Sequence, residues 1–245
     1  MTNLKTFQQP STFTYLGRHA VSLAELVRRL PECPVNVLEI GSGFLEPFYI
    51  ADLIRARWPN EGVGIDAVDV DVNVINTLTK LLNGEKISFV DAATIACNVE
   101  SDGRLRPNSD FLKPEGLALG IRDLEASGLP KKKYLNLDEQ CFVYTGPNYG
   151  IITPRQNEIL VLLTSSRRRY DFIYAGTVIM NMKKTYNHED IARLYVTIQQ
   201  SLSTQGVFAM GTTPADLYGS SSSVKEILDA GFEEITVVVE NLVHA

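Results

Sequence analysis

The chain has 245 residues, of which 44% are hydrophobic and 21% charged, as in ordinary globular proteins. Its formal net charge of −6 excludes the whole-chain basic field that attracts DNA or RNA. No apolar run approaches the roughly 18 residues of a membrane span, and Cys33, Cys97 and Cys141 follow no disulfide or zinc-ligand spacing. We therefore expect a cytoplasmic protein with no metal, nucleic-acid partner or membrane contact.

Residues 1–34 precede the first predicted strand and are expected to form an N-terminal helical cap. Their apolar side chains recur at helical spacing, at Leu23, Leu26, Val27 and Leu30. Pro31 ends this helix. Tyr15, Arg18 and His19 could reach a ligand from the cap, although surface and packing roles are the simpler interpretation of isolated polar residues.

A short apolar strand over 35–40 leads directly into a tight turn at Gly41 and Gly43. Pro47 then occupies a position that favours the first turn of a helix, which is predicted over 48–54. Strand, glycine turn and helix form the first half of a nucleotide-binding βαβ unit. In such a unit the glycines let a ligand lie against the backbone, and the helix N-terminus offers unpaired N–H groups.

Glu39 stands two residues before Gly41, and a carboxylate there suits a positively charged ligand group such as an amino-acid ammonium. A pyrophosphate would be repelled, and the third glycine of the dinucleotide fingerprint is absent. With this acidic-x-Gly-x-Gly pattern the sequence resembles the class I S-adenosylmethionine-dependent methyltransferases. The resemblance implies S-adenosyl-L-methionine as cofactor and a Rossmann-like α/β fold, with a mostly parallel twisted sheet and helices on both faces. The alternative is a buried glycine turn in another α/β protein.

Acidic residues close the next two predicted strands. The second strand ends at Asp69, where the resemblance places the acid that holds the ribose, with Asp66 and Asp71 as alternatives. The third strand is predicted over 86–92, and there the resemblance assigns Asp91 to the adenine. The domain from 35 to 245 would thus bind the cofactor through Glu39, Gly41, Ser42, Gly43, Asp69, Val70, Asp91, Ala92 and Ala175.

A long segment, 93–169, separates the third predicted strand from the fourth. It is polar at first, then turn residues between 141–144 and 149–152 predict a β-hairpin, and 158–163 predict a strand or a buried helical turn. An insertion at this point lies over the carboxyl ends of the strands, where ligands bind in α/β sheets. We expect an inserted lid or substrate subdomain, with a structural elaboration or a dimer arm as the alternative.

The fourth strand is predicted over 170–176, the fifth over 206–211 and the last over 235–239, with helices starting at Asn187 and Val224. In the family that the sequence resembles, the end of the fourth strand faces the transferred group. The candidate catalytic side chains are therefore Tyr174, Asn181, Tyr186 and His188. His188 is the best general base by residue type, although it also fits a plain helix start.

The predicted activity is in-line methyl transfer to a small-molecule substrate, and a homo-oligomer is compatible with the sequence. Two weaker local resemblances leave alternatives open. Residues 43–49 and 170–182 resemble chemotaxis-receptor glutamate methyltransferases, although Ala175 and Gly176 replace the Arg-Asn pair of that family. Residues 40–43 and 174–180 resemble nicotianamine synthase-like enzymes, which transfer an aminocarboxypropyl group.

Further alternatives are a non-catalytic cofactor-binding regulatory protein and a nicotinamide-dependent reductase, which Glu39 disfavours. Two basic runs, 131–133 and 167–169, could receive an anionic substrate, but solvated faces are the simpler interpretation.

Overall fold

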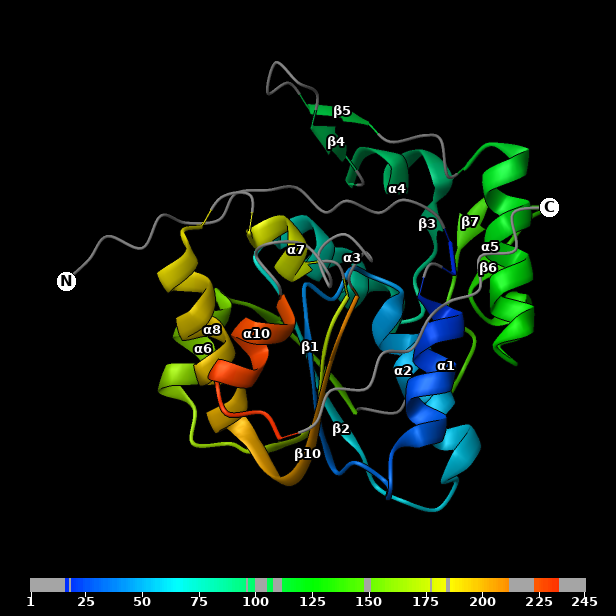
Figure 1. The fold of residues 1–245 in the computed structure, drawn as a ribbon. Helices are drawn as coiled ribbons and strands as arrows, with labels where there is room; N and C mark the ends of the chain where they lie inside the picture. Colours follow the sequence, from blue (N-terminus) through cyan, green and yellow to red (C-terminus); the bar gives the residue numbers. More distant parts are fainter. Residues whose placement is uncertain are drawn as a thin grey trace.

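The computed structural model describes residues 16–17, 19–95, 97–99, 105–107, 112–147, 151–176, 178–183, 186–211 and 223–233. Its centre is a five-stranded sheet in the order β10-β9-β1-β2-β8, in which every neighbouring pair is parallel (Figure 1). The strands are β1 (Asn36–Ile40), β2 (Gly64–Asp69), β8 (Ile152–Gln156), β9 (Tyr170–Ala175) and β10 (Leu202–Met210).

Helices cover both faces of this sheet (Figure 1). One layer holds α1 (Ala20–Arg29), α2 (Glu46–Arg57) and α3 (Val72–Leu82). The other holds α6 (Ile159–Ser165), α8 (His188–Ser201) and α10 (Ser223–Asp229), while the short α7 (Val178–Met182) directly follows β9. The predicted Rossmann-like α/β class is confirmed, and the helix before Pro31 and the strand, glycine turn and helix that start at β1 form where the sequence predicts them.

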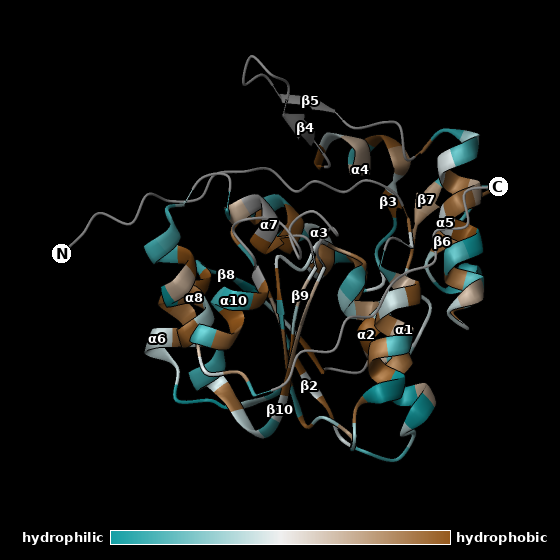
Figure 2. Cartoon of the chain, in the orientation of Figure 1, coloured by the Kyte–Doolittle hydropathy of each residue, from teal (hydrophilic) through white to brown (hydrophobic). Residues whose placement is uncertain are grey.

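Alternation along the strands produces two separate apolar cores. Val37 of β1 and Phe172 of β9 belong to the core under α1, α2 and α3. Leu38 and Ile173, one residue further along each strand, belong to the core under α6 and α8. Both faces are buried because successive side chains of a strand point to opposite sides. Figure 2 accordingly shows the central strands as mainly hydrophobic.

The strand predicted over 86–92 is wrong. Only Ile87–Ser88 is extended (β3), and it pairs with β7 (Cys141–Phe142) in a separate three-stranded sheet. From Phe89 the chain forms α4 (Phe89–Ile95) instead. The amide of Asp91 donates to Ser88 Oγ at 3.0 Å, and the Ser88 hydroxyl lies 2.7 Å from Asp91 Oδ2. The Ser88 hydroxyl thus accepts from the Asp91 amide and donates to the Asp91 carboxylate, and such an N-cap contact stabilises a helix start at the point where the strand ends.

The third strand of the main sheet is β8, which pairs with β2 only after the long segment has been passed. The predicted hairpin over 141–152 is also wrong, because β7 pairs with β3 and with β6 (Leu135–Asn136), whereas Ile152 begins β8. The insertion therefore lies between α3 and β8, before the third strand. Of the residues 158–163, Glu158 caps α6 and the others lie in that helix. The fifth strand starts at Leu202 rather than at Gly206. The last predicted strand, 235–239, lies outside the described residues.

We call the end of the main sheet at which the strands finish its carboxyl edge. In Figure 1, α4 and the antiparallel pair β4 (Cys97–Val99) and β5 (Leu105–Pro107) extend beyond this edge, on the side from which α7 leaves β9. The rest of the insertion, with α5 (Pro114–Ala126), the 3₁₀ turn η2 (Lys131–Lys133) and β6, lies beside α1 and α2.

A buried carboxylate anchors the insertion to α2. Asp52 is 5% exposed, and its Oδ2 accepts a hydrogen bond from the Tyr134 hydroxyl at 2.6 Å. Its Oδ1 accepts from Lys133 Nζ at 2.8 Å and from the Tyr144 hydroxyl at 3.3 Å. Burial, together with the Asp52 charge, raises the pKa of Tyr134 and keeps this phenol protonated. Lys131 pairs with Glu125 at 3.7 Å, so part of the 131–133 basic run has structural partners.

We expect Asp52→Ala to lower the free energy of unfolding by about 2–4 kcal/mol, because it leaves the buried Tyr134 hydroxyl without its acceptor. Urea denaturation of the full chain measures this loss. Asp138→Ala, at an exposed turn position, is the matched control and should stay within about 0.5 kcal/mol of the wild type. A loss of less than about 1 kcal/mol for Asp52→Ala would show that this anchor contributes little.

Candidate functional site

The strand order creates a switch point between β1 and β9. From β1 the chain proceeds through α2 to β2 on one side, while β9 lies on the other side of β1 and continues to β10. In open α/β sheets the crevice outside the carboxyl ends of such a strand pair is where ligands bind. The glycine turn predicted from the sequence lies at this crevice.

The turn over 41–43 closes tightly on β2. The amides of Gly41 and Ser42 both donate to the Val68 carbonyl, at 2.8 and 3.2 Å. Gly41 and Gly43 have φ values of 65° and 59°, which side-chain-bearing residues seldom adopt. A Cβ on Gly41 would also stand 2.8 Å from Cβ of Val178, so α7 approaches the bare backbone closely. Ser42 is fully buried beneath the turn.

Glu39 is a buried carboxylate directly behind the glycine turn. It is 1% exposed, and its neighbours in register are Ala67 of β2 and Tyr174 of β9. Its Oε2 has no hydrogen-bond partner among the described residues. Burial raises the pKa of Glu39 well above its ordinary value, and the charges of Glu46 and Asp69 add to this shift. A buried acceptor with this surplus negative charge around it suits a cationic ligand group.

Asp69 ends β2 on the same face as Glu39, since Ala67 and Ile65, two and four residues earlier, belong to the core under α1, α2 and α3. Its Oδ1 accepts a hydrogen bond from the Asp71 amide at 2.9 Å, and the amides of Gly43 and Val70 also favour its ionised form. Burial outweighs these contacts and raises the pKa of Asp69 to about 6. The glycine turn and the end of β2 therefore form one acidic corner.

The two alternatives to Asp69 have structural partners. Asp66 faces the opposite side of the sheet, where it is 1% exposed. Its carboxylate binds Arg155 Nε at 2.8 Å, Arg168 Nη1 at 2.9 Å and the Tyr170 hydroxyl at 3.0 Å. Asp71 caps α3 by accepting from the Asn73 amide at 2.8 Å.

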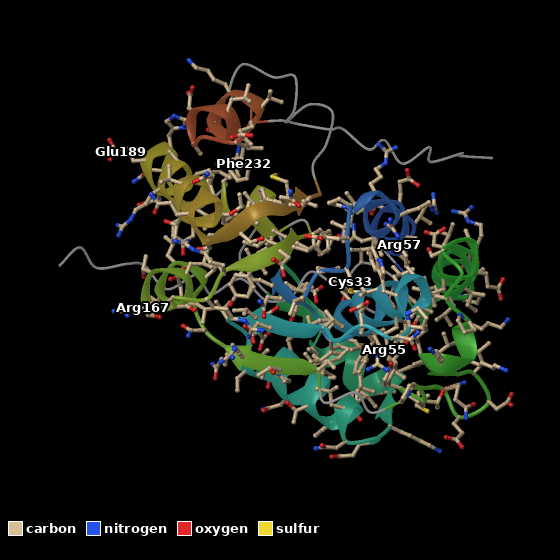
Figure 3. All side chains as sticks on the ribbon, turned by 90° about the horizontal axis from the view of Figure 1, so that it is seen from below. Cys33, Arg55, Arg57, Arg167, Glu189 and Phe232 are labelled. Atoms are coloured by element: carbon tan, nitrogen blue, oxygen red, sulfur yellow. The ribbon has the colours of Figure 1, made fainter. Side chains whose placement is uncertain are left out.

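Arg168 also explains the centre of the 167–169 basic run, because its guanidinium donates to Asn36 Oδ1 as well as to Asp66. Arg167 is exposed at the periphery, as is Glu189 (Figure 3).

The candidate catalytic residues separate in space. Tyr174 lies at the carboxyl end of β9 and is 3% exposed, and the neighbouring Ala175 is fully buried on the opposite face. Asn181 belongs to α7, but its side chain lies outside the described part of the structure. The side chain of His188 is 75% exposed, and its Nδ1 lies 2.8 Å from Glu226 Oε1. His188 therefore contacts α10 rather than the glycine turn.

The observed third strand does not end at Asp91, the residue that the sequence predicted for the adenine. Asp91 is exposed on α4, and Ala92 is buried in the core under that helix. At the end of the observed third strand, Gln156 is the last residue of β8, and Asn157 and Glu158 follow it. The Asn157 amide donates to the Asp69 carbonyl at 3.1 Å, and Gln156 Nε2 reaches the Val70 carbonyl at 3.5 Å.

No protein-family model and no curated protein sequence matches the chain. Solved structures do. The CcbJ methyltransferase from Streptomyces caelestis shares 13% identity at a TM-score of 0.42, over 78% of this chain and 51% of its own. The glycopeptide N-methyltransferase MtfA, in complex with S-adenosyl-L-homocysteine, shares 13% identity at 0.42, over 80% and 54%. An S-adenosylmethionine-dependent methyltransferase from Agrobacterium tumefaciens shares 11% at 0.42, over 87% and 49%.

The chain thus spans about half the length of these structures. Its fold is Rossmann-like, and the parallel strand order with its glycine turn carries that assignment. At such low identity, methyltransferases are what the chain is similar to in fold, and the residues of its own site must carry any statement about chemistry.

Sequence reasoning did not single out Glu46 or the residues after β8. Glu46 begins α2, and its carboxylate folds over Gly43 so closely that a Cβ there would collide with Oε2. Its position three residues after the second glycine indicated this proximity. Within the described residues, no cluster of histidine, cysteine or carboxylate side chains could hold a metal ion, and no helix has the length and apolarity to cross a membrane.

Proposed function

We propose that the chain is an S-adenosylmethionine-dependent methyltransferase that acts on a small-molecule acceptor. The observation that carries this proposal is the buried Oε2 of Glu39 behind the glycine turn, with Glu46 and Asp69 as further carboxylates at the same corner. Such a corner repels the pyrophosphate of a dinucleotide. It attracts a ligand with an ammonium and a sulfonium.

The cofactor's amino-acid part would lie along the backbone of Gly41, Ser42 and Gly43. The absence of side chains at the two glycines permits this approach, and Glu39 would meet the ammonium directly or through water. An ammonium beside Glu39 would compensate the cost of keeping this carboxylate ionised in the interior.

Asp69 would accept hydrogen bonds from the ribose hydroxyls, with Val70 beside the nucleoside. The adenine would then lie between the ends of β2 and β8, near Asn157 and Glu158. This placement follows from the observed sheet order, in which β8 is the neighbour of β2.

When bound, the cofactor supplies an intrinsically reactive methyl group, so the protein's contribution is to bind, align and exclude water. Ala175, Tyr174 and Asn181, at and beyond the end of β9, would border the methyl group and the acceptor. The N-terminal helix and the insertion would cover them. Within 93–169, β8 and α6 belong to the main fold and are not part of the lid. The proposed lid therefore begins with α4 and ends before β8.

Calorimetric titration of the full chain with S-adenosylmethionine, S-adenosylhomocysteine and NADH tests the proposal. We expect micromolar binding of both sulfur ligands and none of NADH. Isotope-labelled S-adenosylmethionine would then report transfer to a panel of small amines, thiols, phenols and carboxylates. Binding of NADH alone would contradict the proposal, and binding of the sulfur ligands without transfer to any acceptor would favour a regulatory protein.

A further inference from the structure

His19 holds an unusual backbone conformation at the start of α1. Its φ and ψ are 70° and −7°, and among the described residues only Gln140 shares a positive φ without being glycine. Left-handed backbone at a side-chain-bearing residue costs on the order of 1 kcal/mol and persists where the surroundings enforce it. Strained backbone of this kind is found most often at functional sites.

Packing on both sides of His19 enforces this conformation. Its carbonyl accepts hydrogen bonds from the Leu23 amide at 2.8 Å and from Ser22 Oγ at 3.1 Å, which fixes it to the first turn of α1. Just before it, Leu16 lies fully buried against α5, where its carbonyl leaves no space for a Cβ on Gly120. His19 is thus fixed to the first turn of α1, and the chain three residues before it is held against α5 of the insertion.

The imidazole of His19 lies at the carboxyl edge of the sheet. Its ring is half-buried and meets the Tyr174 ring edge-on, with 6.3 Å between centroids and 71° between planes. Its Cδ2 and Nε2 would be 3.7 Å from a Cβ on Gly176, and the Tyr174 hydroxyl would be equally near that point. Tyr174 is the register partner of Glu39, so His19 lies over the β1–β9 switch point.

A histidine at this point has a chemistry that the other described residues around the glycine turn lack. The carboxylates of Glu39, Glu46 and Asp69 lie at the acidic corner. His188 is exposed and contacts Glu226. An imidazole titrates near neutrality and therefore suits proton transfer at physiological pH.

We propose that His19, held edge-on against Tyr174, accepts the proton of the substrate atom that receives the methyl group. This proposal rests on the proposed function. In the step, the acceptor atom forms a bond to the methyl carbon while the carbon–sulfur bond breaks, and sulfur keeps that electron pair and becomes a neutral thioether. The proton of the acceptor atom passes to the neutral imidazole, which later releases it to water.

The test exploits a charge difference between the two sulfur ligands. Among the residues that the structure describes, the titratable groups near this edge include Glu39, Glu46, Asp69, Tyr49 and Tyr174, and they are the same with either ligand. Only S-adenosylmethionine carries the sulfonium, which disfavours a protonated imidazole nearby. If His19 lies at the methyl group, its pKa should be lower with S-adenosylmethionine than with S-adenosylhomocysteine by about one unit.

The chain has three histidines, so NMR of the full-length protein with labelled histidine resolves each ring. His19→Asn identifies the His19 resonance, since asparagine tolerates the left-handed backbone and removes the imidazole. This variant should keep its S-adenosylhomocysteine affinity within about twofold, as measured by calorimetry. The His188 resonance serves as the internal control and should not respond to either ligand.

Equal His19 pKa values with the two ligands would overturn the proposal, as would a His19 resonance that neither ligand moves although calorimetry shows binding. A large loss of S-adenosylhomocysteine affinity in His19→Asn would also overturn it, because His19 would then be a binding or structural residue. If neither sulfur ligand binds the wild type, the proposed function itself fails. The proposal is supported if the pKa of His19 is lower with S-adenosylmethionine than with S-adenosylhomocysteine.

Discussion

Glu39→Gln should weaken S-adenosylmethionine binding by about 1.5–3 kcal/mol, roughly 10- to 150-fold, while the ligand-free protein becomes no less stable. The variant removes the charge that would meet the ammonium. It also removes a carboxylate whose ionisation is disfavoured in the ligand-free interior, as the raised pKa of Glu39 shows. Calorimetry and thermal unfolding of the same two proteins measure both effects.

The difference in free energy of unfolding between Glu39→Gln and the wild type should grow as the pH rises. Burial raises the pKa of Glu39 in the folded state above its ordinary value of 4.5. The folded protein therefore binds more protons than the unfolded chain above this pH, and stability falls as pH rises. Glu39→Gln lacks this term, so its advantage over the wild type should be absent below about pH 4.5 and grow above it.

Glu61→Gln is the matched control, because Glu61 is exposed in the turn before β2 and should change neither affinity nor stability. A Glu39→Gln variant that keeps full affinity would mean that the buried carboxylate does not contact the ligand. A variant that instead loses stability at pH 7 would mean that the ionised Glu39 has a partner in the ligand-free protein.

Asp66→Ala and Asp69→Ala should have opposite consequences, although only three positions of β2 separate the two residues. Asp66→Ala should lower the free energy of unfolding by about 2–4 kcal/mol, because Arg155, Arg168 and the Tyr170 hydroxyl all lose their buried acceptor. Its ligand affinity, measured on the folded fraction, should stay near the wild-type value, since Asp66 faces away from the glycine turn.

Asp69→Ala should weaken binding of both sulfur ligands by about 2–4 kcal/mol through the loss of one or two charge-assisted hydrogen bonds to the ribose. Its stability at pH 7 should remain within about 1 kcal/mol of the wild type. Burial raises the pKa of Asp69 to about 6, so at pH 7 the ionised carboxylate lowers the stability of the folded protein rather than adding to it. Urea denaturation and calorimetry of both variants separate the two roles, and unchanged affinity in Asp69→Ala would remove the ribose assignment.

Local sequence determined the elements whose signals span only a few residues. The glycine turn and Glu39 lie within five positions, and an i, i+3 contact such as the Asp190 amide on Asn187 Oδ1 fixes the start of α8. The N-terminal helix and β9 likewise follow from short apolar periodicities. Such patterns depend on nearest neighbours along the chain, so the Rossmann-like class and the glycine corner could be predicted from the sequence alone.

Only the tertiary structure decided which segment becomes the third strand. Residues 86–92 have strand-like side chains, but β3 pairs with β7 in a separate sheet, and β8 occupies the place beside β2. The sequence favoured Asp69 over Asp66 for the ribose, but only the packed sheet shows that Asp66 faces the other side, where Arg155 and Arg168 bind it. His19 reaches the carboxyl edge only because the cap and the insertion pack together. Contacts between segments far apart in the chain make these choices, and no local pattern encodes them.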